Sequence, residues 1–186
     1  MISRILTDKI KYDGSQIAPL WAYSMGIKGD SMVIFHGPMD VTLDNMKDLE
    51  DKKAGKAIQG DDLIHIIVER FDSPASMRLA YYMQRLLMVC IMDVLMRQGI
   101  QTTRFGDDLF IDEGKLTVSI ATAGVTSEKI HCGINITTEG TPAEVRTASL
   151  EELGIADWRP LAREIAETYV NEIEDIEGDI VKTRSL

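Results

Sequence analysis

The alternation of apolar and polar residues is clearest between residues 107 and 136, where it predicts three short strands. Leu109 to Ile111 form an apolar run, Asp112 to Gly114 are typical of a hairpin turn, and Lys115 opens the next strand. This segment therefore predicts a hairpin with a lysine just beyond its turn, followed by one further strand.

Side chains in the second and third of these strands are expected to point alternately to opposite faces of a sheet. One face would hold the core residues Leu116, Val118, Ile120, Ile130, Cys132, Ile134 and Ile136. The other would hold Lys115, Thr117, Ser119, Ala121, His131, Gly133, Asn135 and Thr137. If the strands pair, the second face predicts a pocket for an anionic ligand on a rigid sheet.

Earlier in the chain, Leu63 to Arg70 also alternate and predict a strand. Met32 to Phe35 predict a buried strand that ends before Pro38, because proline cannot donate to a strand ladder. The part of the chain before Asp30 is expected to be irregular.

Apolar residues at helical spacing predict a long helix over 73–98, with Ser73 as N-cap and Pro74 at its first position. Its apolar residues cover more than one face. A helix of this kind is buried on two sides, against a sheet and against a second element, for which we expect a second subunit in a homodimer.

Three shorter helical patterns complete the prediction. Residues 44–53 form an amphipathic pattern that turns Met46 and Leu49 inward. A capping-box spacing at 149–152 predicts a short helix, and Asp157 caps a last helix that ends at Gly178. Strands in antiparallel groups with helices on one side predict an α+β fold, in one domain over 1–186.

Composition narrows the function classes. The chain has 186 residues, 45% of them apolar, and a formal net charge of -10. An acidic surface disfavours nucleic acid and anionic membranes as partners. Cys90 and Cys132 are expected to be buried free thiols. With no leader pattern and no uninterrupted membrane-length apolar run, we expect a cytoplasmic protein.

The segment from Asp107 to Val118, DDLFIDEGKLTV, with the later GINI at 133–136, resembles the catalytic strands of biotin and lipoate protein ligases. Their pattern is roughly N-D-L-x-V-D-G-x-K-[LI]-x-G, then a strand such as G-I-N-V. Residues 149–154 also look like a short helix of biotin ligases. As a whole, the chain resembles an archaeal family of unknown function within that superfamily.

The resemblance implies an antiparallel sheet packed against helices and an activity that joins a small carboxylic acid to a nucleotide, with ATP and Mg²⁺ as cofactors. The lysine that matches Lys115 contacts carboxylate and phosphate in such ligases, so Lys115 is the candidate catalytic residue. A fixed cation there screens the repulsion between two anions. Thr117, Ser119, His131 and Asn135 would line the site. The alternative is that these residues bind no ligand: Lys115 would be a solvated lysine in a hairpin, and the others would form a polar, solvent-facing sheet surface.

Residues 60–65, Gly-Asp-Asp-Leu-Ile-His, match the phosphate-binding loop of the superfamily by position. Gly60, Asp61, Asp62 and His65 are therefore candidate substrate-binding residues. The chain has Ala57-Ile58-Gln59 where the lipoate ligases carry arginines, and Asp61 and Asp62 replace glycines. Two carboxylates would repel a triphosphate unless a divalent cation bridged them.

The same strands suggest an alternative metal site. His36, Asp40 and Glu69 offer further ligands, but His65 and Glu69 lie too far apart on one strand to share an ion. A metal would need a cross-strand pair such as His36 with His65, and a histidine satisfied by a neighbouring carboxylate is the competing interpretation. We predict no metal site.

The N-terminal segment contains aromatic and polar residues that have two equally weighted interpretations. They would either fold over the pocket or pack into the core: Tyr12, Gln16, Trp21 and Tyr23. The leading hypothesis is a ligase-like or acyltransferase-like protein that binds a small carboxylic acid or its adenylate. The alternative is a non-catalytic ligand-binding or assembly module that has lost the phosphate loop. A metal-dependent hydrolase is the third.

Overall fold

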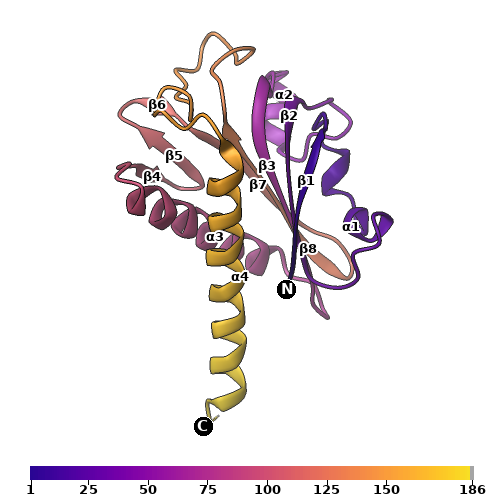
Figure 1. The fold of residues 1–186 in the computed structure, drawn as a ribbon. Coiled ribbons are helices and arrows are strands. Elements are labelled where there is room, and N and C mark those ends of the chain that lie inside the picture. Colours follow the sequence, from indigo (N-terminus) through magenta and orange to yellow (C-terminus); the bar gives the residue numbers. More distant parts are fainter. Residues whose placement is uncertain (185–186) are drawn as a thin grey trace.

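A computed structural model describes residues 1–184 and contains a five-stranded sheet in the order β1-β2-β3-β8-β7 (Figure 1). The strands are β1 (Ile2–Lys9), β2 (Ser31–Asp40), β3 (Gln59–Phe71), β7 (Thr117–Ala123) and β8 (Ser127–Asn135). Only the β1–β2 pair among these is parallel. A smaller antiparallel sheet joins β4 (Thr103–Phe105), β5 (Asp108–Ile111) and β6 (Gly114–Lys115). The predicted α+β class is confirmed; residues 185 and 186 of the predicted domain lie outside the described part.

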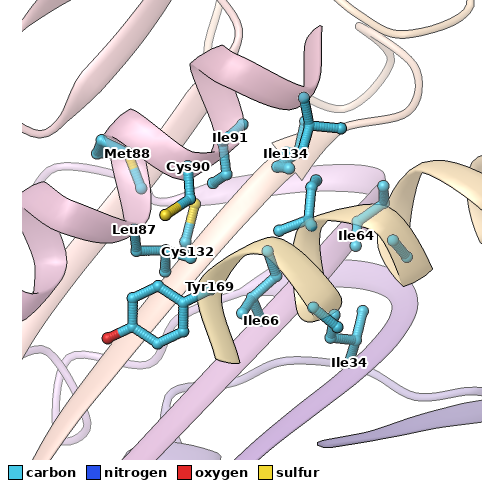
Figure 2. Close-up of a cluster of buried hydrophobic side chains, with 14 of the residues drawn as sticks. Ile34, Ile64, Ile66, Leu87, Met88, Cys90, Ile91, Cys132, Ile134 and Tyr169 are labelled. Atoms are coloured by element: carbon cyan, nitrogen blue, oxygen red, sulfur yellow. The ribbon is translucent and has the colours of Figure 1, made fainter. Parts of the chain in front are cut away.

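Two long helices, α3 (Met77–Arg97) and α4 (Trp158–Lys182), pack on one face of the large sheet. Figure 2 shows Ile64 and Ile66 of β3 facing Leu87 of α3 and Tyr169 of α4, with the sulfur atoms of both cysteines in the same cluster. Cys90 and Cys132 are buried free thiols, as predicted. The C-terminal end of α4 extends beyond the rest of the fold (Figure 1).

The N-terminal segment covers the opposite face of the sheet. It contains the 3-10 helix η1 (Ser15–Ile17) and the short helix α1 (Trp21–Ser24). Tyr12 packs with Phe35, Leu63 and Ile67 in a second apolar cluster. Gly37 allows the N-terminal segment to lie close to β2, because a Cβ at this position would lie 2.2 Å from the carbonyl oxygen of Ile10. Both faces of β3 are thus removed from water.

Two predictions about the first strands were wrong. The segment before Asp30 contains β1, an edge strand whose side chains are mostly exposed and therefore carry no apolar alternation. Strand β2 does not stop before Pro38 but continues to Asp40. The register shifts between Gly37 and Met39, and at such an irregularity a proline without an N–H group is tolerated.

The start of α3 was also predicted too early. Ser76, not Ser73, is the N-cap: its hydroxyl accepts a hydrogen bond from the N–H of Leu79. The N–H of Ser76 donates to the carboxylate of Glu128, which belongs to distant β8. This contact lies 52 residues away in sequence and has no local signal.

The other helix predictions were partly right. Asp157 caps α4 as expected, but α4 continues through Gly178 to Lys182. The capping-box bonds between Ser149 and Glu152 form, yet they close only a turn. The predicted helix over 44–53 is the shorter α2 (Leu49–Ala54), which leaves Met46 buried ahead of it and Leu49 exposed.

The predicted faces of β7 were wrong, because Leu116 interrupts the alternation. Its N–H donates to Leu109 in the small sheet, whereas its carbonyl accepts from Asn135 in the large sheet. The backbone therefore changes sheets at this residue. Beyond it, Ser119 lies opposite Cys132 and shares the helix-covered face, whereas Ile120 lies opposite His131.

Helix α3 is long and apolar enough to cross a membrane by those two criteria, and half of its most apolar window is buried inside the fold. Its buried apolar residues belong to the main core. Its outward side exposes Tyr82, Val89 and Met96 at seven-residue spacing. The homodimer stays a prediction, and this side of α3 is the surface that it would use.

Replacing Ile66 by alanine tests the core between sheet and helices. Ile66 is fully buried, so we expect the free energy of unfolding to fall by about 2–5 kcal/mol, measured by urea denaturation. The matched control is Val125→Ala, at a position 91% exposed, which should change it by less than about 0.5 kcal/mol. Equal effects of the two substitutions would contradict the assigned core.

Candidate functional site

Two adjoining cavities lie beside the N-terminal half of β7, with volumes of about 240 and 210 Å³. Both are lined by Met39, Asp51, Ile58, Lys115 and Val118. The first also contacts Tyr12, Asn45, Met46, Lys47, Asp48, Asp107, Asp108, Ser119, Ile120 and His131. The second also contacts Lys56, Ala57, Gln59, Thr117, Asn135, Thr141, Pro142, Val145 and Thr147.

Lys115 stands where the two cavities meet. It follows the predicted hairpin turn, in which Asp112 adopts the left-handed conformation with φ 50°. Its backbone is held by the segment around Thr147: its N–H donates to the carbonyl of Arg146, and its carbonyl accepts from the N–H of Ala148. The Nζ atom lies 2.7 Å from Oδ2 of Asp108. Lys115 is thus a positioned cation with one carboxylate partner.

Asp108 was not among the predicted site residues. Burial raises the pKa of its carboxyl, and the ion pair with Lys115 opposes that shift. A ligand anion that binds Lys115 must share the ammonium group with this carboxylate or displace it. Its neighbour Asp107 lines the first cavity as well and accepts hydrogen bonds from Gln84 and Ser119.

Thr117 and Ser119 border the cavities, but their hydroxyls are engaged elsewhere. The Thr117 hydroxyl accepts from the N–H of Leu109 at 2.8 Å and so joins the two sheets. The Ser119 hydroxyl lies 2.7 Å from Nε2 of Gln84, on the side of α3. Both residues therefore support the walls of the cavities, and their predicted place on the Lys115 face is corrected.

Asn135 lies near Lys115, as predicted, and lines the second cavity. Its side-chain amide donates to the carbonyls of Lys115 and Ala148, each at 3.1 Å. These bonds fix the backbone that carries Lys115 against the loop after β8. Asn135 is thus placed to position the lysine.

His131 lines the first cavity and forms a buried stack with Tyr12, whose ring centroid lies 3.6 Å from that of His131. Behind them, Nδ1 of His65 lies 3.0 Å from Nε2 of His131, and Nε2 of His65 lies 3.1 Å from the carbonyl oxygen of Gly37. Burial lowers the pKa of His65 to about 4 and also lowers that of His131. Both rings are therefore neutral near pH 7.

Of the N-terminal residues, Tyr12 satisfies both interpretations offered by the sequence, because it is buried in the apolar cluster and also lines the cavity. Trp21 packs against Phe35. Gln16 bonds to the backbone of Lys11, and Tyr23 is exposed.

Gly60, Asp61, Asp62 and His65 form part of β3 and line neither cavity. The N–H of Asp61 donates to Glu139, and the Asp61 side chain packs against Gly140. Asp62 contacts His36 and Lys9. The structure thus brings together Lys115, His131 and Asn135, and it places the predicted phosphate segment in a strand outside the cavities.

A cross-strand metal pair of His36 and His65 is ruled out by the register. His65 lies opposite Phe35, so the neighbouring His36 points to the other face of the sheet. Within residues 1–184 there is no group of three or more His, Cys, Asp or Glu side chains arranged to hold a metal.

The segment between β2 and β3 supplies cavity residues that sequence reasoning missed, among them Asp48, Asp51, Lys56 and Ile58. Asp48 caps α2, and Asp51 forms an ion pair with Lys56 at 2.6 Å. The N-cap pattern before α2 was the one available signal in this segment. It marks a helix start but gives no hint that the helix borders a cavity.

The buried histidines make stability depend on pH. Below pH 6.5 the unfolded chain binds a proton at His65, and the folded protein does not until about pH 4. We expect this side chain to remove about 3 kcal/mol of folding free energy between those pH values. Urea denaturation at pH 7, 5.5 and 4 measures it. The loss should be smaller in His65→Gln, and equal losses in both proteins would contradict the neutral buried ring.

Comparisons with solved structures show which proteins share this fold. A solved protein of unknown function from Pyrococcus horikoshi superposes with a TM-score of 0.93 at 40% identity over the full length of both chains. A biotin protein ligase from Aquifex aeolicus in complex with biotin and ATP gives 0.57 at 13% identity, covering 92% of this chain and 70% of the ligase. A lipoate-protein ligase A bound with ATP gives 0.57 at 12%, covering 94% and 86%. The two ligases share the fold with this chain.

Sequence comparison identifies the family. An uncharacterised protein of Methanocaldococcus jannaschii is 42% identical over 184 residues, which cover 96% of this chain and 82% of that protein. The model of the family described as a domain of unknown function, DUF366, matches residues 1–184. This chain, which has the fold of the biotin and lipoate protein ligases, therefore belongs to the DUF366 family.

Proposed function

We propose that this protein binds a small carboxylic acid and ATP and joins them into an acyl adenylate. The observation that carries the proposal is the place of Lys115, which lines both adjoining cavities. A cation in a shared wall can contact an anion on either side.

The chemistry requires such a cation. A carboxylate oxygen of the acid forms a bond to the α-phosphorus of ATP, and the bond from that phosphorus to the oxygen bridging to the β-phosphorus breaks, which releases pyrophosphate. Two anions must approach each other before the bond forms. A lysine whose backbone N–H and carbonyl are both hydrogen-bonded stabilises this approach with little reorganisation.

Charge and polarity distinguish the cavities. Tyr12, Ile120 and His131 give the first one an aromatic and apolar wall, which suits the body of the acid. Each cavity has two lysines, Lys115 with Lys47 in the first and Lys115 with Lys56 in the second. The first also carries Asp48, Asp107 and Asp108, so the second is the more positive cavity and suits phosphate. Asp51 lines both and is the carboxylate best placed to share a phosphate-bound Mg²⁺, which usually takes only one or two carboxylates from a protein.

A second candidate function is a ligand-binding or assembly module without turnover. The segment 60–65 favours it, because in this chain it is a regular strand with aspartates where phosphate-binding glycines would stand. The preceding residues 57–59 also lack the expected arginines. This candidate predicts binding of an acid or a nucleotide without release of pyrophosphate.

Replacing Lys115 by alanine tests the first candidate. We expect at least about 100-fold slower ATP-dependent formation of acyl-AMP, because the charge that stabilises the joined anions is lost. The assay is pyrophosphate release in the presence of Mg²⁺ with biotin, lipoate or octanoate as the acid, and circular dichroism verifies the fold.

The matched control is Lys53→Ala, an exposed lysine of α2 that lines neither cavity. It should keep the wild-type rate. Turnover that survives in Lys115→Ala would remove the proposed role of the lysine. Ligand binding by the wild-type protein with no pyrophosphate release for any of the acids would favour the module.

A further inference from the structure

The hydrogen bonds behind the first cavity determine where the histidine protons lie. A carbonyl oxygen only accepts, so Nε2 of His65, 3.1 Å from the oxygen of Gly37, carries the proton of that ring. A neutral imidazole has one N–H group, which leaves Nδ1 of His65 as an acceptor. The bond of 3.0 Å between the two rings must then be donated by Nε2 of His131.

This chain of bonds leaves Nδ1 of His131 as a lone-pair acceptor. His131 is only 3% exposed, and what remains exposed belongs to a cavity wall. Among residues 1–184, no group donates a hydrogen bond to this nitrogen. In this part of the chain, the side-chain atoms that are both unpaired and fully enclosed belong to Ser31, Glu128, Thr137 and Tyr169. Nδ1 of His131 is not one of these atoms, so it keeps some accessible surface. Nδ1 is therefore open to the cavity.

The surroundings keep this acceptor in place. The Tyr12 ring lies on the His131 ring with an angle of 9° between their planes, and the bond to His65 fixes the ring edge. Ile120 and Val118 line the same cavity. An acceptor held rigidly among apolar groups favours a ligand that donates a hydrogen bond, because a ligand without a donor would leave the nitrogen unpaired.

We propose that His131 selects carboxylic acids whose far end carries an N–H or O–H donor, and that Nδ1 of His131 accepts that hydrogen bond in the first cavity. The inference rests on the proposed function, since it names the class of acid that the site takes. Acids that end in an alkyl chain or a disulfide ring would bind less well.

Titration calorimetry with paired acids tests the selection. The first pair is 8-hydroxyoctanoate and octanoate, which differ by one hydroxyl group. The second is biotin, whose ring carries N–H donors, and lipoate, whose ring carries none. We expect the donor-bearing acid of each pair to bind at least about tenfold more tightly to the wild-type protein, in the presence of ATP and Mg²⁺.

Three variants locate the effect. His131→Phe keeps an aromatic ring for Tyr12 but removes the acceptor, so the preference should fall below about threefold. Tyr23→Phe, at an exposed position that lines neither cavity, should retain the preference, and circular dichroism verifies the fold of the His131 variant. Lys115→Ala should weaken all acids alike, because it removes the contact with the carboxylate.

The outcomes separate this inference from the proposed function. Acids that bind in a Lys115-dependent way but without preference for a donor would overturn the selection by His131 and leave the proposed function standing. A donor preference that persists in a folded His131→Phe protein would also overturn it. Binding of none of the acids, or binding that Lys115→Ala leaves unchanged, would count against both.

Discussion

Both faces of β3 are removed from water, and the rest of the structure follows from this constraint. The face toward α3 and α4 carries Ile64, Ile66 and Val68 and fills the main core. The opposite face carries His65, and a buried polar ring needs hydrogen-bond partners. The N-terminal segment covers this face, and Gly37 and His131 supply the partners. The wall of the first cavity is therefore a by-product of burying the central strand on both sides.

The change of sheet at Leu116 is the second determinant. It turns Thr117 and Ser119 toward the helix side, whereas Lys115 remains beside the cavities. The hydroxyls of those two residues bond within the protein, so they hold the strands rather than offer groups to a ligand. The lysine reaches the site because it precedes the interruption.

The sequence was sufficient for the parts of the fold whose signals are local. The hairpin before Lys115, the alternation of β3 and the caps at Asp48 and Asp157 depend on neighbouring residues, of which Asp48 was recognised only afterwards. The start of α3 depends on Glu128, far along the chain, and the faces of β7 depend on a change of sheets that alternation cannot reveal. For the site, the sequence predicted Lys115, His131 and Asn135, but the partner Asp108 and the covering segment around α2 required the packed structure.

The shared wall at Lys115 also makes the two cavities thermodynamically dependent on each other. One ammonium group, already paired with Asp108, serves both sides. An anion that enters either cavity takes part of the same positive charge, so its neighbour binds to a less positive wall. Linkage makes this effect reciprocal, and it appears as negative cooperativity between separate anions. A single molecule that spans the wall would escape that penalty.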